Sequence, residues 1–485
     1  MMHDALCITA ATLLLSGCGL YNKYERPTDK KLETTGLIRD VQSDTDTLFV
    51  APQDTASFGN LPWRDVFTDP QLQKLIEQGL EKNANLQNAA LTVKMYESML
   101  KAAKLAFLPA VQVGSSSSPM GTISTLHTSP SVTSKGYSFP VGASWDIDLF
   151  GKVLSQKRST QMKLLGMKDY QMAVRAQLIS GIANSYYTLL MLDRQLEIVT
   201  EMSRMSKETW EMMQLQYKLG RMRSTSVQSA EASYLSMQTQ ANDFRRQIRA
   251  TENALSLLIG QAGQQIPRST LAQQSLPAEF ATGVGVALLK NRPDVHNAEM
   301  QLAACFYDIQ TARAQFYPSI SIGASATFSN NSGQLNPGKW ITTLFGNLTL
   351  PIFSRGALRS NLKVTKLQYE QAFNTWQNSI LSAGNEVSNA LVNYNMYDAN
   401  SKLEQQRIEV LTKNVEDTKA LYTSSGSTYL EVLTAETQLL SAEINKVTDD
   451  FNKMQSVVSL YQALGGGGLP TEADKTEAKT TKANK

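Results

Sequence analysis

The sequence lacks any run of 18 apolar residues, the length that a membrane-spanning helix requires. Its one long apolar stretch covers residues 5–15, at the N-terminus. Cysteine and histidine are scarce, with three of each among 485 residues. We therefore expect no disulfide framework, and the histidines offer no spacing for a metal site. These residues are Cys7, Cys18, Cys305, His3, His127 and His296.

The sequence also has little net charge and no catalytic motif. Its formal charge is +3, which is too small to suggest nucleic-acid binding. Gly151 and Lys152 lack the upstream glycine and the following hydroxyl residue of a P-loop, and HExxH, CxxC and GxSxG motifs are absent. We therefore predict that the protein is not an enzyme and holds no cofactor or metal.

The N-terminal stretch indicates export. Apolar residues lead into small residues and then Cys18, which predicts a signal peptide over residues 1–17. Leu15-Ser16-Gly17-Cys18 resembles a bacterial lipobox, in which the cysteine receives a lipid after cleavage. The alternative is an ordinary cysteine in a signal sequence, and the absence of Lys and Arg from the first four residues is atypical of such a signal.

Two stretches alternate between apolar and small or polar residues, as strands with one apolar face do. In residues 137–149 every odd position is apolar, and in residues 319–329 the apolar residues are at even positions. Residues 110–121 and 340–352 show weaker patterns. Runs of about ten residues with this period fit tilted membrane-spanning strands. A half-buried sheet of a soluble protein is the alternative.

Each strand pair is followed by a long proline-free segment, residues 152–219 and 356–423. A helix of that length would extend roughly 100 Å. Glycine and a capping-box pattern follow each segment, so we expect the chain to turn back there. The patterns are Thr225 with Gln228 and Thr428 with Glu431.

The returning segments carry heptads. Apolar residues step by three and four from Val227 to Leu258 and from Leu433 to Tyr461, which predicts two antiparallel coiled-coil hairpins. Shorter helices are expected before the strands, over residues 83–107 and 293–316. Stacked end to end, a short helix and a returning helix would nearly match one long helix.

The two halves of the chain repeat one another. Phe150 matches Phe353 and Gly181 matches Gly384 at an offset of 203, and the offset from Phe107 to Phe316 is 209. The chain is divided accordingly. The predicted parts are a signal peptide (1–17), a lipidated extended segment (18–62), a first repeat (63–260), an inter-repeat segment (261–285), a second repeat (286–464) and a disordered C-terminal tail (465–485).

Four strands cannot close a barrel, and an open sheet edge in a bilayer leaves backbone groups unpaired at several kcal/mol each. Two copies would give eight strands, whose side chains fill the interior, whereas three copies leave room for a lumen. The expected fold is mostly α with a membrane β part. Each chain would have four β-strands and two long antiparallel coiled-coil helical hairpins, and a trimer would form a 12-stranded β-barrel continued by a 12-helix α-barrel.

Several stretches resemble the outer-membrane efflux channels of the TolC-like family, in its lipoprotein branch. They are Tyr24 to Pro27, Trp63 to Phe67, Asp69 to Leu72, Trp145 to Lys152, Arg292 to Val295, Phe316 to Ile320 and Leu350 to Phe353. The likeness covers roughly residues 18–465. It implies an outer-membrane homotrimer in contact with lipid, with no nucleic acid. It also implies docking to a periplasmic adaptor (membrane fusion) protein and an inner-membrane transporter.

In that family the hairpin tips narrow the tunnel and meet the adaptor. The resemblance implies these roles for residues around two glycines, and plain helix capping is the alternative. The residues are Tyr217, Gly220, Arg221, Ser224, Tyr422, Gly426 and Ser427. Ser427 stands where many relatives have Asp, so the resemblance does not carry over a cation-binding carboxylate ring.

Three further sets of residues allow two interpretations each. Asp146 and Asp148 lie on the polar face of a predicted strand, where they would either line the lumen or cap the following helix. Cys305 is expected to be a packed residue rather than a reactive thiol. A group of methionines would either pack the coiled coil or offer thioethers to a soft metal. They are Met202, Met205, Met212 and Met213.

We predict a passive outer-membrane conduit of a tripartite efflux system for small toxic compounds. Metal ions, or proteins in type I secretion, are the alternative cargoes. A periplasmic coiled-coil scaffold without a pore is the alternative from a different class, and the period-two strands argue against it.

Overall fold

The computed structural model describes residues 21–27, 61–114, 116–119, 135–274, 292–330, 339–423 and 428–467. The chain separates into two compact units, each assembled from three segments. The first comprises Met1–Lys31, Thr92–Lys168 and Asn297–Gln377. The second comprises Leu32–Leu91, Asp169–His296 and Asn378–Lys485. We describe each unit by itself.

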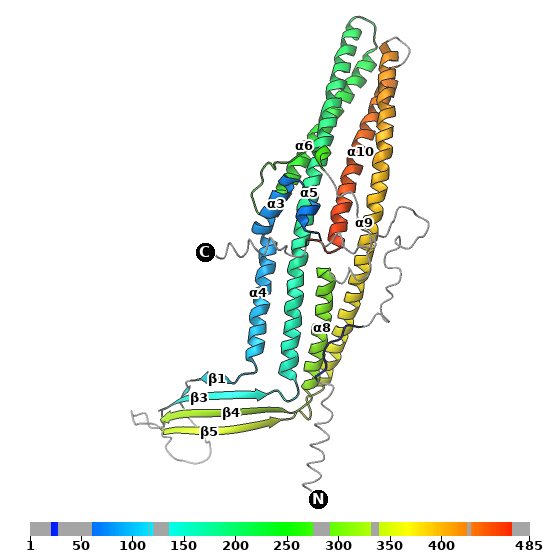
Figure 1. Cartoon of the computed structure of the whole chain (residues 1–485). Helices are drawn as coiled ribbons and strands as arrows, with labels where there is room; N and C mark the ends of the chain where they lie inside the picture. The colour runs from blue at the N-terminus through cyan, green and yellow to red at the C-terminus, as the bar shows by residue number, and fades with distance from the viewer. Residues whose placement is uncertain are drawn as a thin grey trace. The chain divides into compact units, whose positions relative to one another are not determined.

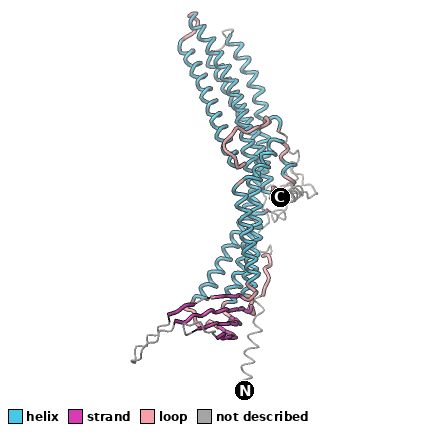
Figure 2. The backbone as a smooth tube through the Cα atoms, turned by 90° about the vertical axis from the view of Figure 1, so that its left-hand side faces the viewer, coloured by secondary structure: helices cyan, strands magenta, loops and turns pink. Residues whose placement is uncertain are grey.

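The first unit contains an antiparallel sheet with the order β1-β3-β4-β5 (Figures 1 and 2). The strands are β1 (Ala110–Val113), β2 (Ser116–Pro119), β3 (Lys135–Ile147), β4 (Ser319–Asn330) and β5 (Lys339–Thr349). One of the two weaker predicted strands, residues 110–121, is split into β1 and β2, and both pair with β3. The other three strands lie within three residues of their predicted bounds.

The strand register places the apolar residues of the alternating patterns in β3 and β4 on one face. Trp145 of β3 lies opposite Ile322 of β4, and Ala324 lies opposite Leu344 of β5. Val111 of β1 lies opposite Ala143. Because a slip of one residue would turn a whole strand over, this shared parity fixes the sheet as one apolar and one polar face.

The six longest of the described helices occur in three pairs of equal length, with one member from each repeat. The short helices α4 (Ala84–Leu105) and α8 (Pro293–Ala314) have 22 residues. The long helices α5 (Lys152–Lys218) and α9 (Ala357–Thr423) have 67. The returning helices α6 (Ser224–Leu258) and α10 (Tyr429–Ala463) have 35. Across the described ranges, no helix combines the length and the hydropathy needed to cross a bilayer.

The helix bounds correct the internal alignment. The ends of α9 and α10 lie 205 residues beyond those of α5 and α6, so the match of Gly181 to Gly384 at 203 was wrong by two residues. Gly151 and Gly356, which precede α5 and α9, both have positive φ and share the larger offset. Two extra residues, Ser354 and Arg355, therefore lie between Phe353 and Gly356, just before α9.

Three shorter helices belong to the second unit. They are α2 (Trp63–Val66), α3 (Pro70–Lys82) and the 3₁₀-helix η5 (Leu271–Gln273). Helix α3 begins as its sequence dictates, because Pro70 occupies the first turn and the Asp69 side chain accepts a hydrogen bond from the Gln71 backbone N–H at 2.8 Å. Trp63 and Phe67 are buried.

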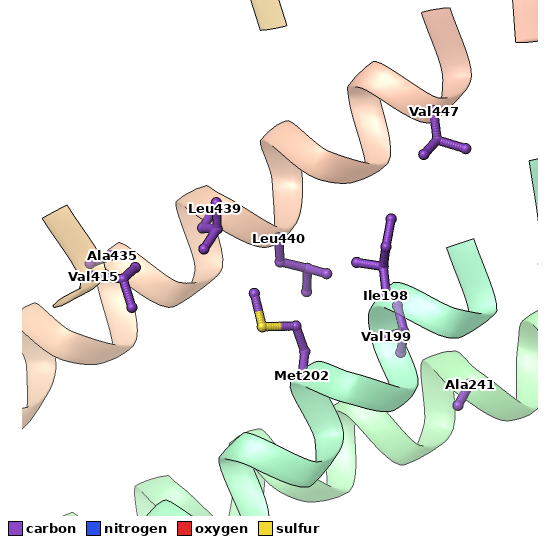
Figure 3. Close-up of a cluster of buried hydrophobic side chains, with 9 residues drawn as sticks. All are labelled: Ile198, Val199, Met202, Ala241, Val415, Ala435, Leu439, Leu440 and Val447. Atoms are coloured by element: carbon purple, nitrogen blue, oxygen red, sulfur yellow. The ribbon is translucent and has the colours of Figure 1, made fainter. Parts of the chain in front are cut away.

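The second unit is held together by apolar residues from both hairpins (Figure 3). Helix α5 supplies Ile198, Val199 and Met202, and α10 supplies Leu439 and Leu440, among others. Ala241 of α6 and Val415 of α9 complete the contact between the four helices. Each large side chain of this kind stabilises the fold by about 1.5–3 kcal/mol when it is fully buried.

The predicted heptad positions are buried or half-buried, with one exception. All ten positions from Val227 to Leu258 are buried or half-buried. In the second hairpin Thr437 is exposed, and its hydroxyl donates to the Leu433 carbonyl at 2.7 Å. Helix α10 buries a second stripe as well, including Val432, Ala435 and Leu439, because it packs against α5 in addition to its own hairpin partner.

The returning helices are joined to the short helices by one side chain in each repeat. The Asn83 side-chain amide donates to the carbonyl of Leu258, the last residue of α6, at 2.9 Å. Arg292 donates to the carbonyl of Ala463, the last residue of α10, at 2.8 Å. The end of each returning helix therefore meets the start of a short helix, as the end-to-end stacking predicts.

Candidate functional site

The apolar face of the sheet in the first unit is unusually exposed. The exposed fractions of Val113, Leu344 and Leu348 are 75%, 81% and 70%, and even the large side chains of the central strands, Trp145 and Ile322, are more than 40% exposed. A contiguous apolar surface of this kind marks contact with lipid or with another protein.

The opposite face carries small and polar residues. One row across the sheet consists of Asp146, Ser321 and Asn347, and the next contains Gly323 and Phe345. The Phe345 ring lies over Gly323, where an added Cβ would stand 2.3 Å from the ring. Asp146 is exposed on this face. Its role in lining a lumen stays a prediction.

Asp148 has a different role from Asp146. Its carboxylate oxygens accept hydrogen bonds from the backbone N–H groups of Val153 (3.1 Å) and Leu154 (2.8 Å), in the first turn of α5. These N–H groups have no partner inside the helix, and a carboxylate at a helix N-terminus is also favoured by the helix dipole. Of the two interpretations, the helix cap holds for Asp148.

Residues 21–27 belong to the first unit and contact its other two segments. The Tyr21 hydroxyl donates to the Leu149 carbonyl at 2.6 Å, and the Tyr24 N–H donates to the Tyr307 hydroxyl at 3.2 Å. Arg26 forms two hydrogen bonds with the buried carboxylate of Glu299, one of them at 2.8 Å. Tyr21 is thereby fixed where β3 passes into α5.

Cys18, the predicted lipidation site, lies outside the described residues. It precedes Tyr21 by three residues, and three residues span at most about 10 Å of extended chain. Because Cys18 lies outside the described residues, its lipidation stays a prediction.

The first hairpin tip is closed by a Schellman motif. Gly220 has φ of +72°, its N–H donates to the Tyr217 carbonyl, and the Arg221 N–H donates to the Gln216 carbonyl, both at 2.9 Å. The side chains of Tyr217, Arg221 and Ser224 are exposed. The predicted capping box of Thr225 and Gln228 was wrong, because α6 starts at Ser224, with Arg223 at its N-cap.

The second tip is described up to Thr423 and again from Thr428. Gly426 and Ser427 lie outside the described residues. The Tyr422 and Tyr429 rings meet edge to face, with centroids 6.5 Å apart, and burial raises the pKa of Tyr429 to about 12, with Glu436 and Tyr422 adding to the shift. The Thr428 N–H donates to the Glu431 carboxylate at 3.2 Å, so the second capping box is confirmed.

The methionines and Cys305 have packing roles. Met202 belongs to the apolar cluster of Figure 3, Met205 packs against it, and Met213 is fully buried, whereas Met212 is exposed. Cys305 is half-buried, and burial raises the pKa of its thiol. Over the described part of the chain, no three His, Cys, Asp or Glu residues are arranged to hold a metal ion.

A polar network in the second unit was not found from the sequence. Asp69 accepts hydrogen bonds from the Tyr186 hydroxyl (2.6 Å), the Gln274 amide (2.8 Å) and the Ser269 hydroxyl. Burial on its own raises the pKa of Asp69, but these bonds together hold it below its usual value. The network ties the segment after α6 to α3 and α5.

The same segment is tied down by an ion-pair cluster. Arg268 donates to both carboxylate oxygens of Asp193 and to the buried Glu252 at 2.7 Å. In the sequence, the one hint of the Asp69 contacts was that Asp69 begins a stretch, Asp69 to Leu72, that resembles the TolC-like family. The three side-chain partners of Asp69 lie 117, 200 and 205 residues away in sequence, and Arg268 lies 75 residues from Asp193, so the contacts follow no period.

The comparison with known proteins identifies the family. The family model described as "Outer membrane efflux protein" matches residues 75–261 and 284–466, one stretch in each repeat. The chain belongs to the outer membrane efflux protein family. It is therefore an efflux channel protein of the outer membrane, and the predicted family, function class and location are confirmed.

Relatives of this outer membrane efflux protein include proteins named for cation efflux and for solvent efflux. The cation efflux system protein CusC of Escherichia coli O157:H7 is 27% identical over 463 residues, covering 94% of this chain and 97% of CusC. The solvent efflux pump outer membrane protein SrpC of Pseudomonas putida is 28% identical over 464 residues, with the same coverage.

Solved structures of the family confirm the predicted fold class. A crystal structure of CusC superposes with a TM-score of 0.76 at 25% identity, covering 86% of this chain and 98% of CusC. The open state of the MtrE outer membrane channel of Neisseria gonorrhoeae gives a TM-score of 0.76 at 25% identity, with 92% and 98% covered.

Proposed function

We propose that this outer membrane efflux protein works as a homotrimer, which passively conducts small toxic compounds outward and performs no chemical step. Three sheets would close into a 12-stranded barrel, with the apolar faces toward lipid and the polar faces around the lumen. The helices of the three chains would continue this lumen into the periplasm. A periplasmic adaptor and an inner-membrane transporter would supply the compounds.

The observation that carries this proposal is the sheet of the first unit. Its apolar face is 70–81% exposed at Leu344 and Leu348, and its edges are the strands β1 and β5. In a bilayer, backbone groups on such edges must be paired because lipid offers no hydrogen bonds. Further copies of the chain satisfy this requirement, and a closed assembly leaves no edge.

Purified full-length protein tests the assembly. We expect trimers by mass measurement in detergent and stepwise current in planar lipid bilayers. The matched control is the same preparation after heating, which should dissociate the trimer and abolish the current. A stable monomer that passes no current would overturn the proposal and favour the scaffold alternative.

Small organic compounds are the proposed cargo. The polar face of the described strands carries mostly Ser, Thr, Gly and Asn, together with Asp146 and Phe345, and these strands contain no Cys, Met or His that would bind a soft metal. Met202 and Met205 face the helix core instead of a pore. A deletion strain should become hypersensitive to solvents, dyes and detergents, and the wild-type gene should restore resistance. Hypersensitivity to copper or silver salts alone would favour the metal-export alternative.

Lipidation of Cys18 is supported by the contacts of residues 21–27. With Tyr21 held at the β3–α5 junction, a lipid on Cys18 would lie close to the point where the strands leave the bilayer. Cys18→Ser should abolish incorporation of labelled palmitate while Cys305→Ala retains it. Equal labelling of the Cys18→Ser variant would exclude this site.

The hairpin tips are proposed to dock the adaptor. Tyr217, Arg221 and Ser224 are exposed beside the tight turn at Gly220, and Tyr422 would contribute from the second tip together with Gly426 and Ser427. Arg221→Glu should abolish compound resistance while trimer formation and bilayer conductance remain. Arg246→Glu, at an exposed site on α6, is the control. Full resistance in the Arg221 variant would remove this residue from the docking surface.

A further inference from the structure

The polar face of the sheet carries one large aromatic side chain. Among the strand residues whose side chains are described, Phe345 of β5 is the only aromatic residue on that face, and its exposed fraction is 39%. The row of residues in which it lies otherwise holds small side chains, Ala110 of β1, Ser144 of β3 and Gly323 of β4. A phenyl ring therefore lies on a surface made of small and polar groups.

Gly323 is the support on which this ring rests. The three atoms at the outer end of the Phe345 ring are the nearest neighbours that a Cβ on Gly323 would meet, so the side chain crosses from β5 onto the backbone of β4. Gly323 is buried, unlike every other strand residue whose exposure is described. An aromatic ring over a cross-strand glycine is favourable because it packs on backbone that no side chain covers. One side of the ring is thus held against β4, and the other side stays exposed.

The same face carries one carboxylate. Asp146 of β3 lies in the adjacent row, opposite Ser321, and the β5 residue of that row is Asn347, two positions from Phe345. Rows on one face of a sheet are about 7 Å apart, and β3 and β5 are two strand spacings, about 10 Å, apart. Within the strands whose side chains are described, Asp146 is the one charged residue. An apolar ring and a negative charge therefore lie close to the same level of the sheet.

We infer that Phe345 and Asp146 form a binding site in the lumen for organic cations with an apolar body, such as lipophilic phosphonium and quaternary ammonium ions. The inference rests on the proposed trimer, whose threefold symmetry would place three rings and three carboxylates around one level of the lumen. The carboxylates would raise the local concentration of cations, and the rings would bind them through apolar contact and cation–π attraction. The site gives the proposed conduit a preferred class of cargo.

The exposure of both side chains suits a site through which a compound passes. Conduction requires that a ligand bind well enough to enter and weakly enough to leave. Asp146 and Phe345 are both exposed, so a bound cation would keep part of its contact with water. The site would therefore select cations with an apolar body without retaining them.

Single-channel recordings of the full-length trimer with tetraphenylphosphonium test the site. This cation should interrupt the potassium current of the wild type in brief blocks whose frequency rises with its concentration. Phe345→Ala should weaken the block by roughly tenfold, the scale expected when an aromatic contact with a cation is lost. Phe345→Tyr, which keeps a ring, should retain the block. Leu344→Ala, at the neighbouring position on the apolar face of β5, is the matched control and should be blocked like the wild type.

A second variant tests the charge independently of the ring. Asp146→Asn keeps the size of the side chain and removes its charge, so it should also weaken the block by tetraphenylphosphonium. An unchanged block in this variant would remove Asp146 from the site.

The outcomes separate this inference from the proposed function. Only conducting channels are recorded, so poor assembly of a variant does not imitate a loss of block. A wild-type channel that conducts potassium but is not blocked would overturn the inference and leave the conduit intact. A lower yield of Phe345→Ala trimers with an unchanged block would also overturn it, since the ring would then serve only to cover Gly323. A protein that carries no current would overturn the proposed function, and this inference with it.

Discussion

At the residue scale, two aspartates two positions apart do different work. Asp146 and Asp148 appear alike in the sequence, as acidic residues at the same parity of one strand. The strand ends at Ile147, however, and the chain then turns so that Asp148 reaches the first N–H groups of α5. Asp146 stays on the polar face of the sheet, opposite Ser321.

Replacing each aspartate by alanine should separate the two roles. Asp148→Ala should destabilise the protein by about 1 kcal/mol, since two N-terminal donors lose their acceptor. Asp146→Ala should leave stability unchanged but reduce the cation preference of the channel. Thermal denaturation in detergent and reversal potentials under a salt gradient measure the two effects. Equal destabilisation by both changes would contradict this assignment.

At the element scale, the segment after α6 is held by the hydrogen bonds of Asp69. Because these bonds keep the Asp69 pKa below its ordinary value, their stabilisation is fully present above the ordinary pKa and is lost as pH falls through the lower, folded-state pKa. The pH dependence of stability has the same direction for any carboxylate whose hydrogen bonds favour its ionised form.

Hydrogen exchange at Ser269 checks this pH dependence. Its backbone N–H donates to the Tyr186 hydroxyl at 3.1 Å. After correction for intrinsic rates, protection in the wild type should fall as pH is lowered past the ordinary aspartate pKa and through the lower pKa of Asp69, because protonation removes the form that its hydrogen bonds favour. Asp69→Asn should show low protection at every pH, and Glu77→Gln, an exposed control, should match the wild type. Protection that stays constant through the protonation of Asp69 would refute the mechanism.

The first hairpin tip depends on one backbone conformation. Gly220 has φ of +72°, so Gly220→Ala should cost about 1–2 kcal/mol. Gly181→Ala is the matched control inside α5, where the nearest atom would be 3.7 Å away. That change should stabilise the helix by up to about 1 kcal/mol. Urea unfolding followed by circular dichroism compares them, and a loss of stability at Gly181 alone would count against the turn geometry.

The helices and the central strands were predictable because they repeat. Periods of two and of three to four residues gave β3, β4 and both hairpins to within two or three residues. The capping box at Thr225 failed because the tight turn at Gly220 let α6 start earlier. The Asp69 network could not be predicted, since hydrogen bonds between residues far apart in sequence leave no local pattern.

At the scale of the whole molecule, the two faces of the sheet decide which side of it meets lipid and which side meets water in the proposed trimer. Leu344 and Thr343 are neighbours on β5, and they lie opposite Ala324 and Ser325. Only Leu344 would face lipid in the proposed trimer, while Thr343 would face water. The two positions therefore give a matched comparison that uses the same substitution.

Arginine at the two positions should have opposite consequences. Leu344→Arg should cost about 2–4 kcal/mol of membrane stability, as expected for a charge near the bilayer midplane. Thr343→Arg should assemble normally and shift conductance toward anions. The yield of trimer in the outer-membrane fraction is the measurement. Normal assembly of the Leu344 variant would mean that this face does not contact lipid.

The equal lengths of the paired helices limit how such a protein can evolve. One added residue turns everything beyond it by about 100°, which would swing a heptad stripe out of its seam. The two halves have kept 22, 67 and 35 residues in their helices and differ at connections such as Ser354 and Arg355. The protein can therefore acquire new specificity through point substitutions or insertions in loops. Lengthening one helix would require matching insertions in every helix packed beside it.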